Sequence, residues 1–185
     1  MKTVTLFRHA KSGSKNSPDI DDFDRPLAGR GVKAAPKMGA AMRERKLRPG
    51  LILCSPSVRT RQTLALAAPE AWDSPPEVRF EERLYGAGSQ TLFKALRELA
   101  EDIVHVMIVG HNPGLQELAI ALAPPGSAAR QLFTEKLPAA AVACFDFDIE
   151  RWEKLKPGTG RLRHAITPKS LQSEAKGKNN ANDYR

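Results

Sequence analysis

Short apolar runs of the kind that form buried strands alternate with longer segments of helical spacing along most of this chain. Strand-like runs occupy residues 2–7, 51–54 and 103–109, and helical spacing occurs over residues 29–46 and 57–68. Strands that alternate with helices predict a mainly parallel sheet with helices on both of its faces. The expected fold is therefore a three-layer α/β/α sandwich.

The rest of the chain continues this pattern, with an amphipathic helix and two strands expected over residues 89–100, 140–149 and 161–166. Asn112 is suited to cap a helix that has Pro113 at its first position. Pro36 is expected to end or kink the helix in which it lies. Two segments rich in Gly, Pro, Ser and charge, 12–26 and 124–138, predict surface loops.

The length of 185 residues is enough for one domain with a real core, and the composition is that of an ordinary globular protein. No apolar run reaches the roughly 18 residues of a membrane span, and the first residues form a strand rather than a signal peptide. Cys54 and Cys144 lie in apolar runs, as expected of buried free thiols in a reducing cytoplasm. We expect a domain over residues 1–171 and a polar, basic, disordered tail over residues 172–185.

A basic and a titratable side chain, Arg8 and His9, stand directly after the first strand-like run. In open α/β sheets the carboxyl ends of the strands are where ligands bind. A histidine there can act as a base or a nucleophile, and a neighbouring guanidinium suits a phosphate and disfavours a charged imidazole. The pair alone is a weak signal.

Two further strand ends carry residues of the same kind. Arg59 follows the strand at 51–54 and falls in the first turn of a helix, although Arg59 and Arg61 alone would be interpreted as solvated helix arginines. His111 follows the strand at 103–109 at a strand-to-helix turn, where a lone histidine is more often structural. Because the ends of parallel strands converge, their joint presence favours one phosphate-binding site.

Together these three motifs resemble those of the histidine phosphatase superfamily, which has the phosphoglycerate mutase-like fold. The motifs are R-H-A at 8–10, S-P-x-x-R-T-x-Q-T at 55–63 and G-H-N-P at 110–113. The short length, together with the runs D-R-P-L at 24–27, G-R-G at 29–31 and I-T-P-K-S-L at 166–171, resembles the SixA-type phosphohistidine phosphatase branch. The resemblance covers residues 1–171.

The resemblance implies a phosphatase in which His9 attacks phosphorus and forms a phosphohistidine intermediate that water then hydrolyses. Arg8, Arg59 and His111 would surround the phosphoryl oxygens and stabilise the charge of the transferring group. They would also lower the pKa of His9, so that it attacks as neutral imidazole. No cofactor or metal is expected, since the arginines supply the positive charge and the four histidines lack metal-ligand spacing.

Three more residues are candidates for the site. Glu82 precedes an R-x-Y-G run much as an acid does in the mutases, so Glu82, or its neighbour Glu81, is a candidate general acid; a plain surface glutamate is the alternative. Lys11 and Ser12 follow the nucleophile and could reach the phosphate, although a loop lysine is usually solvated. His105, inside a strand, is expected to be structural.

The leading interpretation is a cytoplasmic, monomeric phosphatase that removes phosphate from phosphohistidine in a signalling protein such as a histidine phosphotransfer domain. The alternatives are a phosphomonoesterase acting on a small phosphorylated metabolite and a non-catalytic phosphate-binding module. A mutase is disfavoured because the loops are short, and retention of His9 and His111 argues against a non-catalytic module. The net charge of +8 favours acidic partners, but no nucleic-acid motif accompanies it.

Overall fold

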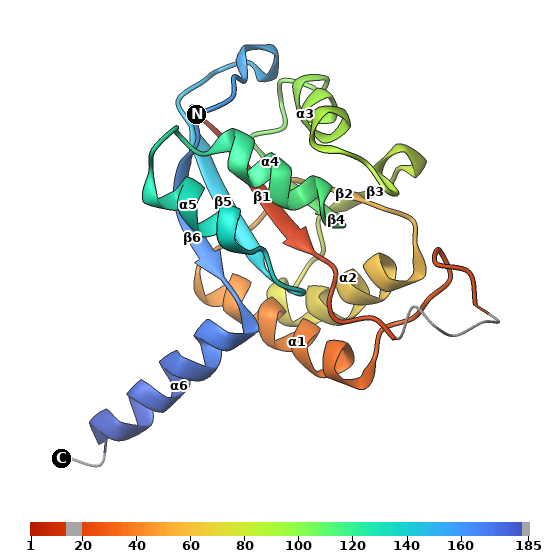
Figure 1. Ribbon diagram of the computed structural model, residues 1–185, viewed down its shortest axis with the longest axis vertical. Helices are drawn as coiled ribbons and strands as arrows, with labels where there is room; N and C mark the ends of the chain where they lie inside the picture. The colour runs from red at the N-terminus through yellow and green to blue at the C-terminus, as the bar shows by residue number, and fades with distance from the viewer. Residues whose placement is uncertain (14–19, 183–185) are drawn as a thin grey trace.

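A single twisted sheet forms the centre of the computed structural model, which describes residues 1–13 and 20–182 and places side chains up to residue 175 (Figure 1). In this part of the chain the strand order is β3-β2-β4-β1-β5-β6. The first four strands are parallel, whereas β5 pairs antiparallel with both β1 and β6. The strands are β1 (Lys2–Arg8), β2 (Leu51–Cys54), β3 (Glu77–Phe80), β4 (His105–Gly110), β5 (Val142–Phe147) and β6 (Arg161–Ile166).

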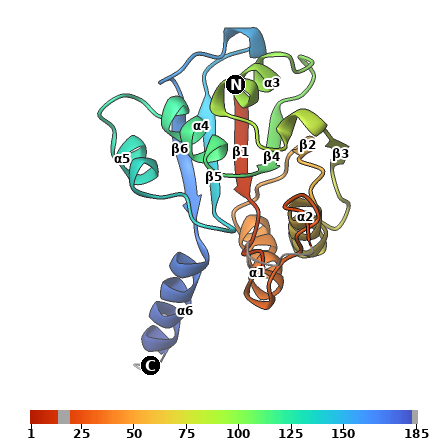
Figure 2. The same cartoon turned by 45° about the vertical axis from the view of Figure 1, so that its right-hand side comes forward.

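Helices cover both faces of the sheet, so the expected three-layer α/β/α arrangement is confirmed (Figure 2). The helices are α1 (Gly29–Glu44), α2 (Val58–Ala71), α3 (Ser89–Arg97), α4 (Gly114–Leu122), α5 (Ala128–Glu135) and α6 (Pro168–Asn182), with short 3₁₀ turns η1 (Glu82–Leu84) and η2 (Trp152–Lys154). One core lies between the sheet and the α1–α2 pair, and the other lies under α3, α4 and α5. Apolar strand residues fill both cores because a parallel strand is buried on both faces.

The predicted helix boundaries were wrong at two prolines. Pro36 does not end α1, which runs from Gly29 to Glu44 with the proline inside it. Met38 and Met42 lie beyond the proline and are buried in the core between α1, α2 and the sheet. This packing outweighs the low helix propensity of proline.

The cap predicted for α4 is also corrected. Pro113, not Asn112, is the residue that precedes the first turn, and α4 begins at Gly114. The amide of Asn112 donates to Gln116 Oε1 and to the carbonyl of Leu137 instead, at 2.9 and 3.1 Å. The side chain therefore ties the α4 turn to the segment before β5.

The segment 124–138 is not only a loop, because it contains α5. Its Pro-Pro-Gly run at 124–126 suggested a loop throughout, yet Ser127 caps a helix by accepting a hydrogen bond from the Arg130 amide at 3.1 Å. Phe133 of α5 is buried in the core beside Phe145. Long-range burial of this one ring accounts for a helix that local composition did not indicate.

The last helix, α6, runs from Pro168 to Asn182 and so includes residues 172–182 of the segment expected to be a disordered tail; residues 183–185 lie outside the described part of the chain. Reciprocal hydrogen bonds at 3.0 Å link the amides and hydroxyls of Thr167 and Ser170 at the start of this helix. Arg45, the residue that follows α1, forms an ion pair with Glu174, and both figures show α6 extending away from the sheet. No described helix has the length and apolar character needed to cross a membrane.

Candidate active site

Three strand ends meet at the carboxyl edge of the sheet because β1, β4 and β2 are adjacent and parallel. The His9 amide donates to the Gly110 carbonyl at 3.0 Å, and the Ser55 amide donates to the Val109 carbonyl at 3.0 Å. The residues that follow the three strands are thus held side by side by backbone hydrogen bonds. The sheet itself brings His9 and His111 together, with their ring centroids 5.2 Å apart.

A cleft of about 870 Å³ opens at this edge. It is lined by Arg8, His9, Lys11, Ser12, Gly13, Asp22, Arg25, Arg59, Tyr85, Gly86, His111, Asn112, Lys136, Pro138 and Ala139. The lining therefore contains both motif histidines and both motif arginines, together with Lys11 and Ser12. Among the described lining residues, five side chains are cationic and one is a carboxylate, so the cleft is suited to an anion.

Glu82 is not in this cleft. It is exposed at the start of η1, and neither it nor Glu81 is among the lining residues, whereas Tyr85 and Gly86 of the same segment are. Glu81 instead pairs with Arg83 at 2.6 Å. The η1 turn directs the glutamates away and the tyrosine inward, and spacing along the chain could not indicate this.

His9 has one ring nitrogen engaged by the backbone. Its Nδ1 lies 2.8 Å from the carbonyl of Ala10, so Nδ1–H donates there and Nε2 is left as the unprotonated atom. Burial, followed by the charges of Arg59 and Arg8, lowers the pKa of His9 to about 4 against the opposing effect of this hydrogen bond. The imidazole is therefore neutral at physiological pH.

The loop that carries His9 is held in place by α2. The Ala10 amide donates to Thr63 Oγ1 at 2.9 Å, and that hydroxyl donates to the carbonyl of Arg59 at 2.7 Å. Gly31 of α1 lets its helix approach closely, since a Cβ there would lie 2.2 Å from the Lys11 carbonyl oxygen. Small and hydroxyl-bearing side chains thus fix the position of His9 relative to Arg59.

His111 faces His9 from the end of β4. Its Nε2 lies 2.8 Å from the hydroxyl of Ser55, and its Nδ1 has no partner among the described residues. Burial, followed by the charge of Arg59, lowers the pKa of His111 to about 3. A hydrogen bond donated by Ser55 would leave the Nδ1–H of a neutral ring as a donor.

A carboxylate that sequence reasoning missed, Asp22, joins two arginines and a tyrosine. It accepts hydrogen bonds from Arg59 Nη2 at 2.9 Å, from Tyr85 Oη at 2.9 Å and from Arg25 Nη2. Although partial burial opposes the change, the Tyr85 hydrogen bond and the charge of Arg59 lower the pKa of Asp22 to about 2. Asp22 lies in the predicted loop 12–26, and the local signal was an acidic cluster next to Arg25.

Unpartnered buried polar atoms are concentrated in this cleft. In the part of the chain that the structure describes, the buried side-chain nitrogen and oxygen atoms without a hydrogen-bond partner are Arg8 Nε, Arg25 Nε, Arg59 Nε, His111 Nδ1 and Asn112 Oδ1. Every one of these atoms belongs to a residue that lines the cleft. Because buried polar atoms are nearly always paired in folded proteins, four unpaired donors at one place indicate a binding site for an anion.

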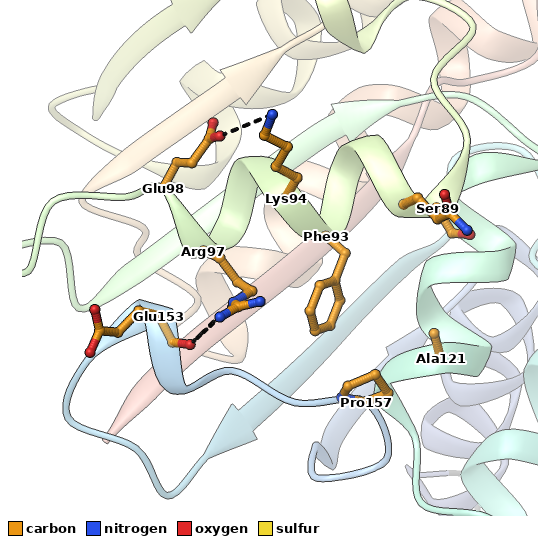
Figure 3. A pocket seen from close by; sticks show the side chains of 9 residues that line it. Ser89, Phe93, Lys94, Arg97, Glu98, Ala121, Glu153 and Pro157 are labelled. Atoms are coloured by element: carbon orange, nitrogen blue, oxygen red, sulfur yellow. Dashed lines mark hydrogen bonds and ion pairs between the residues drawn. The ribbon is translucent and has the colours of Figure 1, made fainter.

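A second hollow of about 480 Å³ lies between α3 and the η2 segment, away from the three strand ends (Figure 3). Arg97 spans it by donating to the backbone carbonyl of Glu153, and Phe93 forms part of its wall. Its described lining contains neither histidine nor cysteine. The described residues also contain no group of three His, Cys, Asp or Glu side chains placed to hold a metal ion.

Comparison with known proteins finds relatives over most of the chain. The Mycobacterium tuberculosis protein Rv1276c is 34% identical over 158 residues, which is 84% of this chain and 95% of that protein. The Mycobacterium leprae protein ML1117 is 35% identical over 159 residues, with the same two shares. Both relatives carry no assigned activity, and no family model matches the sequence.

Comparison with solved structures identifies the class of protein. A protein from Agrobacterium tumefaciens assigned as the phosphohistidine phosphatase SixA superposes with a TM-score of 0.77 at 27% identity, over 90% of this chain and 98% of that one. A protein from Nakamurella multipartitia with the same assignment gives 0.75 at 29% identity, over 90% and 96%. The fold is therefore that of a phosphatase. The chain belongs to the histidine phosphatase superfamily, as its three motifs indicated.

Proposed function

We propose that the protein hydrolyses phosphohistidine in a partner protein, with His9 as the nucleophile. The observation that carries this proposal is the absence of a usable acid from the described lining of the cleft. Asp22 is its only described carboxylate, and with a pKa of about 2 it is ionised at neutral pH. Glu82 lies outside the cleft.

A poor leaving group needs a proton, whereas the imidazole of phosphohistidine does not need one from the enzyme. An alkoxide leaving from a phosphomonoester requires a general acid. An imidazole can instead be protonated by solvent on its distal nitrogen, which makes the P–N bond easy to break near neutral pH. A cleft that supplies donors but no acid is thus suited to a phosphoramidate.

In the first step the Nε2 lone pair of His9 attacks phosphorus in line with the leaving nitrogen. A new P–N bond forms to His9 as the old P–N bond breaks, and its electron pair leaves on the substrate imidazole. Arg8, Arg59 and His111 donate to the equatorial phosphoryl oxygens, where charge is concentrated. The Nδ1–H bond to the Ala10 carbonyl holds the ring and stabilises the cation that forms on phosphorylation.

In the second step water attacks the phosphohistidine and inorganic phosphate leaves. The P–N bond to His9 breaks, its electron pair returns to Nε2, and the proton of the attacking water goes to phosphate or solvent. The low pKa of His9, about 4, makes its imidazole a good leaving group at neutral pH. The same burial therefore assists both steps.

The distribution of positive charge around the cleft supports a protein substrate with an exposed phosphohistidine. Lys11 and Lys136 are exposed members of its lining, so positive charge extends from the buried donors to the surface. A phosphohistidine at the surface of an acidic protein, such as a phosphotransfer domain, would meet this charge on approach.

The test compares two kinds of phosphate bond. Wild-type protein, His9→Ala and Glu82→Gln are incubated with a protein phosphorylated on histidine and with a panel of phosphomonoesters, and phosphate release is followed. We expect wild type to favour phosphohistidine, His9→Ala to be inactive and Glu82→Gln to match wild type. Faster turnover of a monoester that collapses in Glu82→Gln would assign the protein to the phosphomonoesterases, and equal turnover by His9→Ala would exclude His9 as nucleophile.

A further inference from the structure

Asp22 occupies a position that an anionic ligand would be expected to take. Three donors from separate segments converge on its carboxylate: Arg59 from α2, Arg25 from the segment before α1, and Tyr85 after η1. All three donors line the cleft, as Asp22 itself does. The two guanidinium groups form the kind of charge-assisted cradle that binds a phosphoryl group, and the phenol adds a hydrogen bond that holds the Asp22 carboxylate between them.

Asp22 also consumes the donors that a phosphoryl group would need. Both terminal nitrogens of Arg59 bind Asp22, one through the backbone carbonyl and one through the carboxylate. The terminal nitrogens of Arg25 bind Asp22 and the carbonyl of Gly13. While Asp22 is bound, Arg59 can still offer its unpartnered Nε to a phosphoryl group, so the two anions compete for one guanidinium. Rotation of the Asp22 side chain would free Nη2 for a further hydrogen bond to phosphate.

The carboxylate is the partner that is free to move. The side chain of Asp22 is 49% exposed and lies on a turn, whereas that of Arg59 is 6% exposed and held within α2. Rotation of Asp22 toward water costs little, because a carboxylate is well solvated there. Movement of Arg59 would leave a guanidinium buried without a partner, which is costly.

We propose that Asp22 is a specificity-determining residue. Its carboxylate is an internal anion that binds the arginines of the cleft and is displaced only by a ligand of higher negative charge. The proposal rests on the proposed function for the place where the phosphoryl group binds. A dianionic phosphoryl group has more charge and one more oxygen than the carboxylate, so it displaces Asp22. A monoanion such as a carboxylate or a phosphodiester gains no more from the arginines than Asp22 already does. Return of Asp22 after the reaction would also help phosphate to leave.

The test measures binding of inorganic phosphate and of dimethyl phosphate at pH 8 by calorimetry, with no need for turnover. For Asp22→Asn and Asp22→Ala we expect phosphate to bind at least roughly tenfold more tightly, because its competitor for two charged donors has been removed. Dimethyl phosphate, which wild type should bind barely if at all, should become measurable. The control Asp21→Asn removes the same charge from an exposed neighbour and should change the phosphate Kd by less than about twofold.

A charge-neutral variant separates displacement from simple repulsion. Tyr85→Phe removes one hydrogen bond to the Asp22 carboxylate, so it should loosen Asp22 and tighten phosphate binding severalfold. Weaker phosphate binding in the Asp22 variants would overturn the proposal and make Asp22 an orienting partner of the arginines. Equal tightening in Asp21→Asn, no gain in Tyr85→Phe, or no phosphate binding by any form would overturn it as well.

These results are distinguishable from failure of the proposed function. Tighter phosphate binding by Asp22→Asn in a protein that does not hydrolyse phosphohistidine would leave the role of Asp22 intact and remove only the substrate. Unchanged binding in a protein that does hydrolyse phosphohistidine would remove only the role of Asp22.

Discussion

The two ends of strand β4 each have a histidine with a strongly lowered pKa, but only one of them is in a cleft. His105 begins the strand and His111 follows its last residue. Burial lowers the pKa of His105 to about 4 and that of His111 to about 3. His105 Nε2 lies 2.8 Å from the Thr5 hydroxyl and is thereby satisfied, whereas His111 retains an unpartnered Nδ1 beside Arg59 and His9. A lowered histidine pKa therefore indicates a functional site where it coincides with hydrogen-bond donors that have no described partner.

Replacement of His9 should have the largest effect on phosphate release. The same replacement at His105 tests whether the two ends of β4 differ in function. His9→Gln should lower phosphate release at least roughly a thousandfold, because it removes the ring nitrogen proposed to attack phosphorus. His105→Gln should keep the rate within about threefold of wild type, since its contacts with Thr5 and the Arg48 backbone lie at the opposite end of β4 from the cleft. Steady-state rates on phosphohistidine protein check both. A comparable loss in His105→Gln would show that the two ends of β4 are not distinct.

Arginine replacements give the next largest effect. Arg59→Ala should reduce kcat roughly a hundredfold or more, because it removes a buried donor from the phosphoryl group. Arg61, two positions further along the same motif, is exposed and lies over the Phe80 ring at 5.0 Å. Arg61→Ala should therefore leave kcat within about threefold of wild type. Similar kcat losses in both variants would place the effect in α2 as a whole rather than in the cleft.

Ser55 tests whether His111 is oriented through its hydrogen bond. Ser55→Ala should lower kcat about tenfold, since it frees the His111 ring at Nε2 without touching phosphate. Ser57 is a buried serine that bonds Thr60 instead, at 2.8 Å, so Ser57→Ala is the control and should lower thermal stability more than kcat. Ser55→Thr, which restores the hydroxyl, should recover most of the rate, and failure to do so would argue for a steric role.

The smallest expected effect is on stability at acid pH. His9, His105 and His111 have lower pKa values folded, at about 4, 4 and 3, than the ordinary 6.5. As pH falls below 6.5, these histidines become protonated in the unfolded chain but stay neutral in the folded protein. The free energy of unfolding should therefore fall between pH 6.5 and about 4. Urea denaturation from pH 7.5 to 4.5 measures how the free energy of unfolding depends on pH. In His105→Gln this slope should correspond to the uptake of one proton fewer on unfolding. A slope unchanged by that substitution would contradict the lowered pKa of His105.

Much of the site could be predicted because its residues directly follow strands. Arg8 and His9 end the first apolar run, and His111 ends the clearest one, so the parallel-sheet rule alone brings them to one edge. Arg59 was equally accessible, since the helix that carries it starts four residues after β2. The roles assigned to these residues remain proposals, but their proximity is an observation.

The positions of Glu82 and Asp22 relative to the cleft could not be predicted from local sequence. Glu82 was chosen by its place before an R-x-Y-G run, and the η1 turn leaves it exposed while Tyr85 faces the cleft. Asp22 stands in a loop that local sequence described only as acidic, and it reaches the cleft through contacts with residues 37 and 63 positions away. Loop conformation depends on such distant contacts, which no local pattern contains.

Strand periodicity and the parallel-sheet rule were enough to predict the α/β class and the meeting of two histidines and two arginines, because both depend on local sequence and repeat along the chain. Tertiary structure alone decided which carboxylate belongs to the cleft. It brought Asp22 between Arg25, Arg59 and Tyr85 and left Glu82 in solvent. The physical reason is that an ion pair between distant segments forms only after the sheet has fixed their separation, whereas a strand end is specified by its own residues.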